Sequence, residues 1–194
     1  MERRDGKRLP AVGFLTVVRN DQHGLLGGYL VLNVNGRPLE FHCTAPVKPN
    51  RAQEILFGPA LEPYLYGEQI GKTLIAKSEV QPLAVCTDLA AVLSVRQFVN
   101  LPVALVLPAG PDDRPEPCEA APLDGPSYRV DSSHPAVSLA TFRLGRNRLA
   151  VASGSLADRA SLASSLESIA DTFDLAEPFE RIRNAIDEAR RSTR

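Results

Sequence analysis

The sequence predicts a mixed α/β fold that begins with a three-stranded antiparallel meander and continues with alternating helices and strands before C-terminal helices. Residues 12–18 and 28–34 are apolar, β-rich runs, and the second is apolar on both faces of the pleat. Such a pattern is typical of a central strand that is covered on both sides. Asn35-Gly36 follows and favours a type I′ hairpin turn, because both central residues of that turn need a positive φ. The return strand is expected from about residue 38 to residue 45.

Helices and short strands alternate after the meander. Asn50 can cap a helix over residues 51–57, which ends at Gly58-Pro59. Residues 82–88 form a short β-rich run that ends in an acid, and residues 102–107 form another. Because strands separated by helices usually pair in parallel through crossovers, we expect these two strands to extend the sheet with αβαβ units.

The composition divides the chain into four parts. Residues 1–10 are charged and predict a flexible basic tail, and residues 11–107 form the α/β core domain. Residues 108–128 are rich in proline and acids, which is typical of a linker or a long loop. Residues 129–194 predict a β-hairpin followed by two amphipathic helices, either packed on the core or acting as a partner-binding unit.

The last helix is expected to start at Pro178 and carries an apolar stripe of Phe179, Ile182 and Ile186 between charged residues. Such a helix can dock in a groove on another protein, so these three residues are the candidate partner-binding residues. The alternative is that the stripe packs on its own domain.

Charge and cysteine content disfavour several classes of protein. The formal net charge of −1 does not support a dedicated nucleic-acid binder, which usually has a basic excess. No apolar run reaches the length of a membrane span. The three cysteines are far apart and odd in number, unlike a disulfide framework or a structural zinc site. We therefore expect a cytoplasmic protein.

Glu40, His42 and Cys43 are the densest cluster of reactive side chains. Successive strand residues point to opposite faces, so Glu40 and His42 share one face while Cys43 points to the other. This alternation disfavours a nucleophilic pair of Cys43 and His42. Glu40 and His42 remain candidate ligand-binding residues, and the alternative is that they only line a partly solvated face.

The element order of the meander, the following helix and the strand that ends in Asp88 resembles the RNase H-like fold. In that family, acids on the first strand, the first helix and the fourth strand converge on magnesium ions. The resemblance implies Asp88 as the fourth-strand acid, with Glu54 on the helix and Asp21 as the remaining candidate. However, the first strand has no acid, and Asp21 comes only in the turn that follows it. A simpler interpretation is that Asp88 caps the next helix.

Three functions are compatible with the sequence. The first is a non-catalytic interaction or accessory protein, whose partner is another protein. The second is a metal-dependent nuclease or phosphoesterase of RNase H-like shape, for which Mg²⁺ would be the cofactor. The third is a small-ligand binding domain. Among these, the first explains most, because no complete catalytic constellation is present in the sequence.

Overall fold

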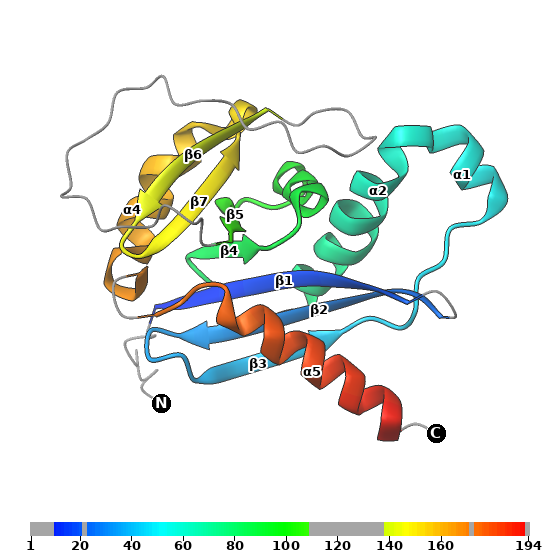
Figure 1. The fold of residues 1–194 in the computed structure, drawn as a ribbon, viewed down its shortest axis with the longest axis horizontal. Helices are drawn as coiled ribbons and strands as arrows, with labels where there is room; N and C mark the ends of the chain where they lie inside the picture. The colour runs from blue at the N-terminus through cyan, green and yellow to red at the C-terminus, as the bar shows by residue number, and fades with distance from the viewer. Residues whose placement is uncertain (1–9, 21–22, 109–137, 171–172, 193–194) are drawn as a thin grey trace, which may run out of the picture.

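The meander at the N-terminus is present as predicted. In the computed structural model, which describes residues 10–20, 23–108, 138–170 and 173–192, strands β1 (Ala11–Asn20), β2 (Gly24–Asn33) and β3 (Pro38–Cys43) pair antiparallel. Figure 1 shows them side by side at one end of the sheet. Eight consecutive residues of β2, Leu25 to Leu32, are buried, as expected for a strand that is covered on both faces.

The turn between β2 and β3 differs from the predicted type I′ turn. Only Gly36 has a positive φ, of 71°, whereas Asn35 does not. The side chain of Asn33 accepts hydrogen bonds from the backbone N–H groups of Asn35 and Arg37, both at 3.0 Å. The turn is therefore one residue longer and is stabilised by a side chain, so a single positive φ at the glycine is enough to reverse the chain.

The helix after the meander is α1 (Arg51–Phe57), and its cap is the predicted one. The side chain of Asn50 accepts a hydrogen bond from the N–H of Gln53 at 2.8 Å, and the Gln53 side chain accepts one from the N–H of Asn50 at 3.0 Å. This reciprocal pair is a capping box. The chain then continues through four consecutive helical pieces: η1 (Gly58–Ala60), α2 (Leu61–Pro63), η2 (Tyr64–Lys72) and α3 (Thr73–Lys77).

Two parallel strands follow, as predicted. The first, β4 (Ala84–Thr87), pairs with β1, and the second, β5 (Val103–Leu107), pairs with β4. Between them lies the 3₁₀ segment η3 (Ala90–Gln97). The resulting order β3-β2-β1-β4-β5 places an antiparallel meander beside parallel strands, so the mixed α/β class with RNase H-like element order is confirmed.

The C-terminal part of the chain extends the same sheet. Strands β6 (Leu139–Leu144) and β7 (Asn147–Ala152) form a hairpin, and β7 pairs antiparallel with β5. The described strands therefore form one seven-stranded mixed sheet in the order β3-β2-β1-β4-β5-β7-β6. The helices that follow are α4 (Ala157–Ala170), after the short turn η4 (Ser153–Ser155), and α5 (Glu177–Ser192). Residues 1–9 of the predicted tail and 109–128 of the predicted linker lie outside the described residues.

Both faces of the sheet carry a hydrophobic core. One cluster contains side chains from α4 and α5, and the other contains side chains from η2 and η3. Two adjacent glycines of β2 allow helices to approach from both sides. A Cβ atom on Gly27 would lie 2.1 Å from Ile70, and one on Gly28 would lie 2.3 Å from Ile182. Since side chains of neighbouring strand residues point to opposite faces, each glycine admits a different helix.

Candidate functional site

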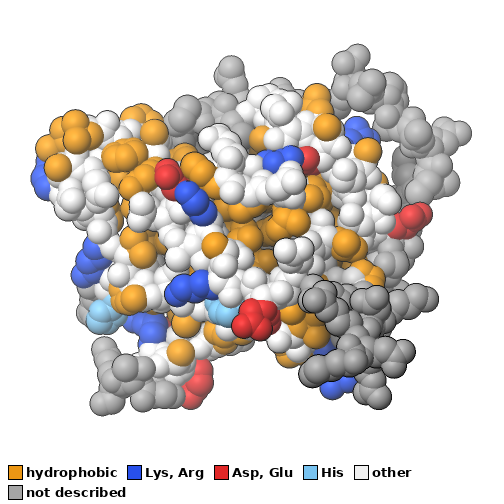
Figure 2. Space-filling view, turned by 180° about the vertical axis from the view of Figure 1, so that it is seen from behind, with side chains coloured by type: hydrophobic (Ala, Val, Ile, Leu, Met, Phe, Trp, Pro, Cys, Tyr) orange, Lys and Arg blue, Asp and Glu red, His pale blue; other side chains and the backbone are white. Residues whose placement is uncertain are grey.

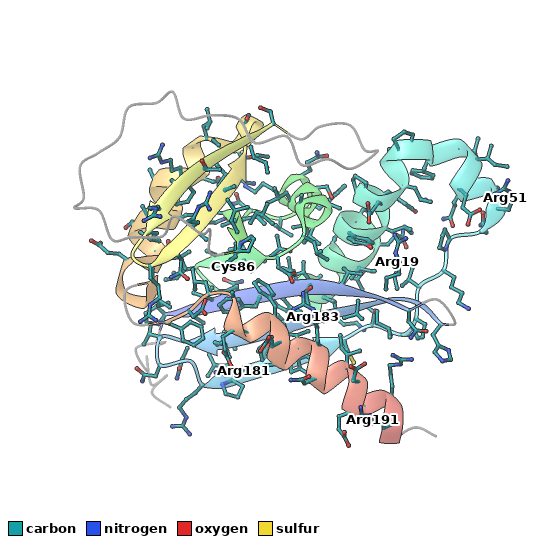
Figure 3. The ribbon with its side chains drawn as sticks, viewed as in Figure 1. Arg19, Arg51, Cys86, Arg181, Arg183 and Arg191 are labelled. Carbon is teal, nitrogen blue, oxygen red and sulfur yellow. The ribbon has the colours of Figure 1, made fainter. Side chains whose placement is uncertain are left out.

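Asp88 lies directly after β4, where the sequence predicts an acid of functional interest. Its carboxylate forms an ion pair with the guanidinium of Arg183, which reaches it from α5 (Figure 3). The side chain of Asp88 is 18% exposed and that of Arg183 is 43% exposed. The ion pair neutralises the acid and joins α5 to the end of β4.

The residue of β1 beside Asp88 is a threonine. The parallel register between β1 and β4 runs to Leu15 opposite Thr87, so Thr16 and Asp88 are the next residues along. Phe14 and Cys86, which precede them by two, both belong to the core beneath α5. The strand alternation therefore directs Thr16 and Asp88 to the α5 face. A hydroxyl stands at the β1 position where the resemblance implies a metal-binding carboxylate.

The interpretation of Asp88 as a helix cap is wrong. The segment η3 starts after Leu89, which is extended, and its first turn has no side-chain cap. The hydroxyl of Thr87 accepts the hydrogen bond from the N–H of Leu89 instead, at 3.2 Å. Asp88 is directed to Arg183 because strand alternation places its side chain on the α5 face. In the sequence, Arg183 is only a charged residue outside the apolar stripe of its helix, and no pattern links it to Asp88.

Of the other two acids of the nuclease alternative, Glu54 does not join Asp88. Glu54 lies on α1 and forms an ion pair with Arg51 at 3.1 Å, and the side chain of Glu54 is 42% exposed. Figure 3 shows Arg51 and Arg183 at well separated places, so the two acids that they bind are also apart. Asp21 lies outside the described residues. Within the part of the chain that the structure describes, no group of three His, Cys, Asp or Glu residues is placed to hold a metal ion.

Glu40 and His42 share a face of β3 and touch, as the alternation predicts. The Nε2 atom of His42 lies 3.2 Å from Oε2 of Glu40. The carboxylate of Glu40 also accepts hydrogen bonds from the hydroxyl of Ser78 at 2.6 Å and from the backbone N–H groups of Glu79 and Val80 at 3.1 and 2.8 Å. The Ser78 hydrogen bond is the main cause that lowers the pKa of Glu40, with His42 and the two backbone donors adding to it. Glu40 thus anchors the chain after α3 to β3.

The two described cysteines are in different environments. Cys43 is exposed on the face of β3 opposite to His42, and Cys86 is buried in β4. Burial raises the pKa of the Cys86 thiol to about 12, so this thiol stays protonated at neutral pH.

The apolar stripe of α5 packs on its own sheet. Phe179, Ile182 and Ile186 are each at most 2% exposed and belong to the core that covers β1 and β2. The ring of Phe179 meets that of Phe14 edge-on, with the centroids 5.8 Å apart. This corrects the prediction that the three side chains contact a partner: burial against the large apolar face of the sheet outcompetes exposure to solvent. A partner of α5 would have to contact its other residues.

Large apolar side chains are exposed elsewhere. On α1 none of the residues is buried, and Ile55 and Leu56 are 66% and 82% exposed. Hydrophobic side chains gather at this end of the molecule (Figure 2, upper left). On the edge strand β3, Leu39 and Phe41 are 44% and 38% exposed. The signal for α1 was present in the sequence as three consecutive apolar residues, Ile55 to Phe57, on a seven-residue helix.

The chain is thus a mixed α/β protein with RNase H-like element order. Asp88, the acid that follows β4, is bound by Arg183 of the C-terminal helix. No family model matches the chain, and no curated protein matches it in sequence. Among solved structures, the crystal structure of human ENDOV is similar to 95% of this chain and 86% of that chain, at 16% sequence identity and a TM-score of 0.41. A similarity of this degree carries no conclusion about the site. No helix of the described segments is long and apolar enough to cross a membrane.

Proposed function

We propose that the chain is a non-catalytic accessory protein that binds another protein through the exposed apolar end of α1. The observation that carries this proposal is the exposure of Ile55 and Leu56 at 66% and 82% on a helix with no buried residue. Exposed apolar side chains that are adjacent to each other are common in protein–protein interfaces, whereas single ones need no explanation. Full burial of one such side chain is worth about 1.5–3 kcal/mol, so two could anchor an interface.

The local structure suits α1 to this role. A seven-residue helix is too short to be stable on its own in water. Here the capping box of Asn50 and Gln53 closes its N-terminus, and Phe57 stacks on Tyr64 with the ring centroids 4.2 Å apart. These contacts hold the helix while its apolar side chains remain in solvent. Figure 1 shows α1 projecting at one end of the molecule, away from the sheet.

The environment of Asp88 supports this choice over the nuclease alternative. A carboxylate that is already bound by Arg183 has its charge neutralised, and a metal ion would have to displace the guanidinium. Glu54, in turn, lies on the projecting helix and is bound by Arg51. The ligand-binding alternative is less favoured because Glu40 directs its oxygens to donors of its own chain.

The test uses the double variant Ile55→Ser/Leu56→Ser, with Leu156→Ser as the matched control because Leu156 is also exposed, at 53%. Affinity purification with the full chain first identifies a protein that co-purifies. Calorimetry with that purified protein should then show a Kd at least tenfold weaker for the double variant and unchanged for the control, which corresponds to about 1.4 kcal/mol or more. Equal Kd values for the wild type and the double variant would exclude α1 as the binding site.

The nuclease alternative has its own measurement. If Mg²⁺ or Mn²⁺ raises the melting temperature of the wild type but not that of Asp88→Asn, the acid binds a metal and the accessory proposal has to be revised. Cleavage of mixed nucleic-acid substrates by the wild type, and not by this variant, would have the same consequence.

A further inference from the structure

We propose that two copies of this chain pair through their β3 strands to form a two-fold symmetric dimer, with Phe41 of each copy at the axis. The partner at this surface is a second copy of the same chain and not the protein bound by α1. The proposal depends on three features of β3: its backbone, its exposed side chains and its position under the end of α5.

The backbone of β3 has an open edge. In the order of the described strands, β3 is at one end and pairs only with β2. The N–H of Thr44 donates to the carbonyl of Gly27 at 3.0 Å, so Thr44 directs its backbone groups toward β2. In an antiparallel pair this direction alternates, so His42 and Glu40 also bond toward β2, whereas Cys43 and Phe41 direct their N–H and C=O groups outward. These outward groups are available to another strand.

The side chains along this edge are apolar on one face. Phe41 lies opposite Leu30, and Cys43 lies opposite Gly28, so both are on the sheet face that α5 covers. Phe41 is 38% exposed and Leu39 is 44% exposed. Edge strands of monomeric proteins usually carry charges, prolines or bulges that discourage pairing. β3 has Pro38, Glu40 and a register shift between these two residues, but its segment from Phe41 to Cys43 is regular and apolar on the α5 face.

The charges on the other face favour the register with Phe41 opposite its own copy. With Phe41 opposite its own copy, Glu40 of each chain lies opposite His42 of the other chain. An axis at Glu40 would place two carboxylates opposite each other, which is unfavourable. The register at Phe41 also joins residues whose backbone groups point outward on both strands, so their N–H and C=O groups can form a reciprocal pair of hydrogen bonds. The aromatic rings of the two Phe41 residues then lie side by side.

The end of α5 fits the same register. A Cβ atom on Gly28 would contact Ile182 and Ile186, so α5 crosses the sheet close to Cys43, which lies opposite Gly28. Figure 1 shows the C-terminal end of α5 continuing past β3. In the proposed register, the strand of the second copy runs beside Cys43 and therefore close to this end of α5.

The pairing is expected to be weak and to depend on concentration. Pro38 is the first residue of β3 and Pro46 follows the strand; both lack an N–H group, which limits the length of the new ladder. Only a short strand and one helix end take part, so the interface is at the small end of specific interfaces.

Sedimentation velocity of the full chain should show a monomer at about 1 µM and a dimer at about 100 µM. The variant Phe41→Glu should remain monomeric over this range.

Disulfide trapping tests the register directly. In a Cys43→Ser/Cys118→Ser background, we introduce Phe41→Cys, and in the same background Ile55→Cys serves as the control because Ile55 is even more exposed. Directly opposed residues in a hydrogen-bonded pair have Cα atoms about 5.5 Å apart, within the range that a disulfide spans. Mild oxidation should therefore cross-link Phe41→Cys at least tenfold faster than Ile55→Cys.

Two results would overturn the dimer. One is a wild-type chain that stays monomeric at all concentrations, which would leave β3 open to a different partner. The other is cross-linking of Phe41→Cys that is no faster than that of the control. Far-UV circular dichroism of each variant verifies that it is folded. The readouts also separate this inference from the proposed function, since Ile55→Ser/Leu56→Ser should not affect the dimer.

Discussion

Gly28→Ala is the substitution that examines most directly how α5 is held on the sheet. A Cβ atom at this position would lie 2.3 Å from Cγ2 of Ile182 and 2.9 Å from Cδ1 of Ile186. Carbon atoms pack best at about 3.5–4.0 Å, so the helix has to move by about 1 Å or more. Overpacking of this kind costs about 1–3 kcal/mol. Replacing glycine within a strand recovers about 0.5–1 kcal/mol of backbone entropy, so the net effect is destabilising.

Thermal unfolding measures this effect. For a chain of this size, a loss of 1 kcal/mol lowers the Tm by about 2–4 °C. The control is Gly154→Ala, because a Cβ atom there has no atom within 4 Å and should change the stability by less than about 0.5 kcal/mol. If both variants melt at the same temperature, α5 does not pack against Gly28 as described.

A double-mutant cycle refines the argument. Ile182→Ala alone should cost about 2–5 kcal/mol because it leaves a cavity in the core. In the double variant Gly28→Ala/Ile182→Ala, the new methyl group occupies part of that cavity and no longer clashes. The two effects should therefore differ from additivity by about 1 kcal/mol or more. Strict additivity would contradict direct contact between the two positions.

Three further predictions concern charged groups. Asp158 accepts two hydrogen bonds from Arg96, at 2.5 and 3.1 Å. In urea titrations, Asp158→Ala should therefore lower the free energy of unfolding by about 1.5–3 kcal/mol. Adding Arg96→Met to this variant should lower it little further. Asp88→Asn and Arg183→Met should each cost about 1 kcal/mol, and the double variant should cost no more than either one, because one partly exposed ion pair is lost in every case. The pKa of Glu40 is lowered in the folded state. The stability advantage of the wild type over Glu40→Gln should therefore be complete above the ordinary pKa of 4.5 and should disappear as the pH falls through the lowered pKa. Equal pH dependence of stability in the two proteins would refute this.

Much of the fold could be predicted because the local signals agree with the global arrangement. The apolar run in β2, the cap at Asn50 and the alternation of strands and helices after α1 each correspond to an element of the structure. The turn after β2 was mispredicted because the side chain of Asn33 bonds to the turn and favours a different geometry from the one that Asn35-Gly36 suggests. The pairing of β7 with β5 could not be predicted, because no local pattern specifies which strand of a sheet a distant hairpin joins.

The candidate site was harder to predict than the fold. The shared face of Glu40 and His42 follows from strand alternation alone. The binding of Asp88 by Arg183 depends on where α5 lies, and these residues are 95 positions apart in the sequence. An amphipathic helix has the same sequence pattern whether its apolar face packs on its own sheet or binds a partner. The stripe of Phe179, Ile182 and Ile186 therefore could not indicate which of the two surfaces it contacts.

The position of α5 on β1 and β2 also affects how the chain folds during synthesis. The first strands to leave the ribosome have one face that is covered only when residues 177–192 have been made. Contacts between the two ends of the sequence are slow to form because a long loop has to close first. Until then, an apolar face of the meander is exposed to other nascent chains. The protein is therefore expected to depend on chaperones more than its modest length would indicate, and shortening α5 should affect its yield in cells before it affects any binding.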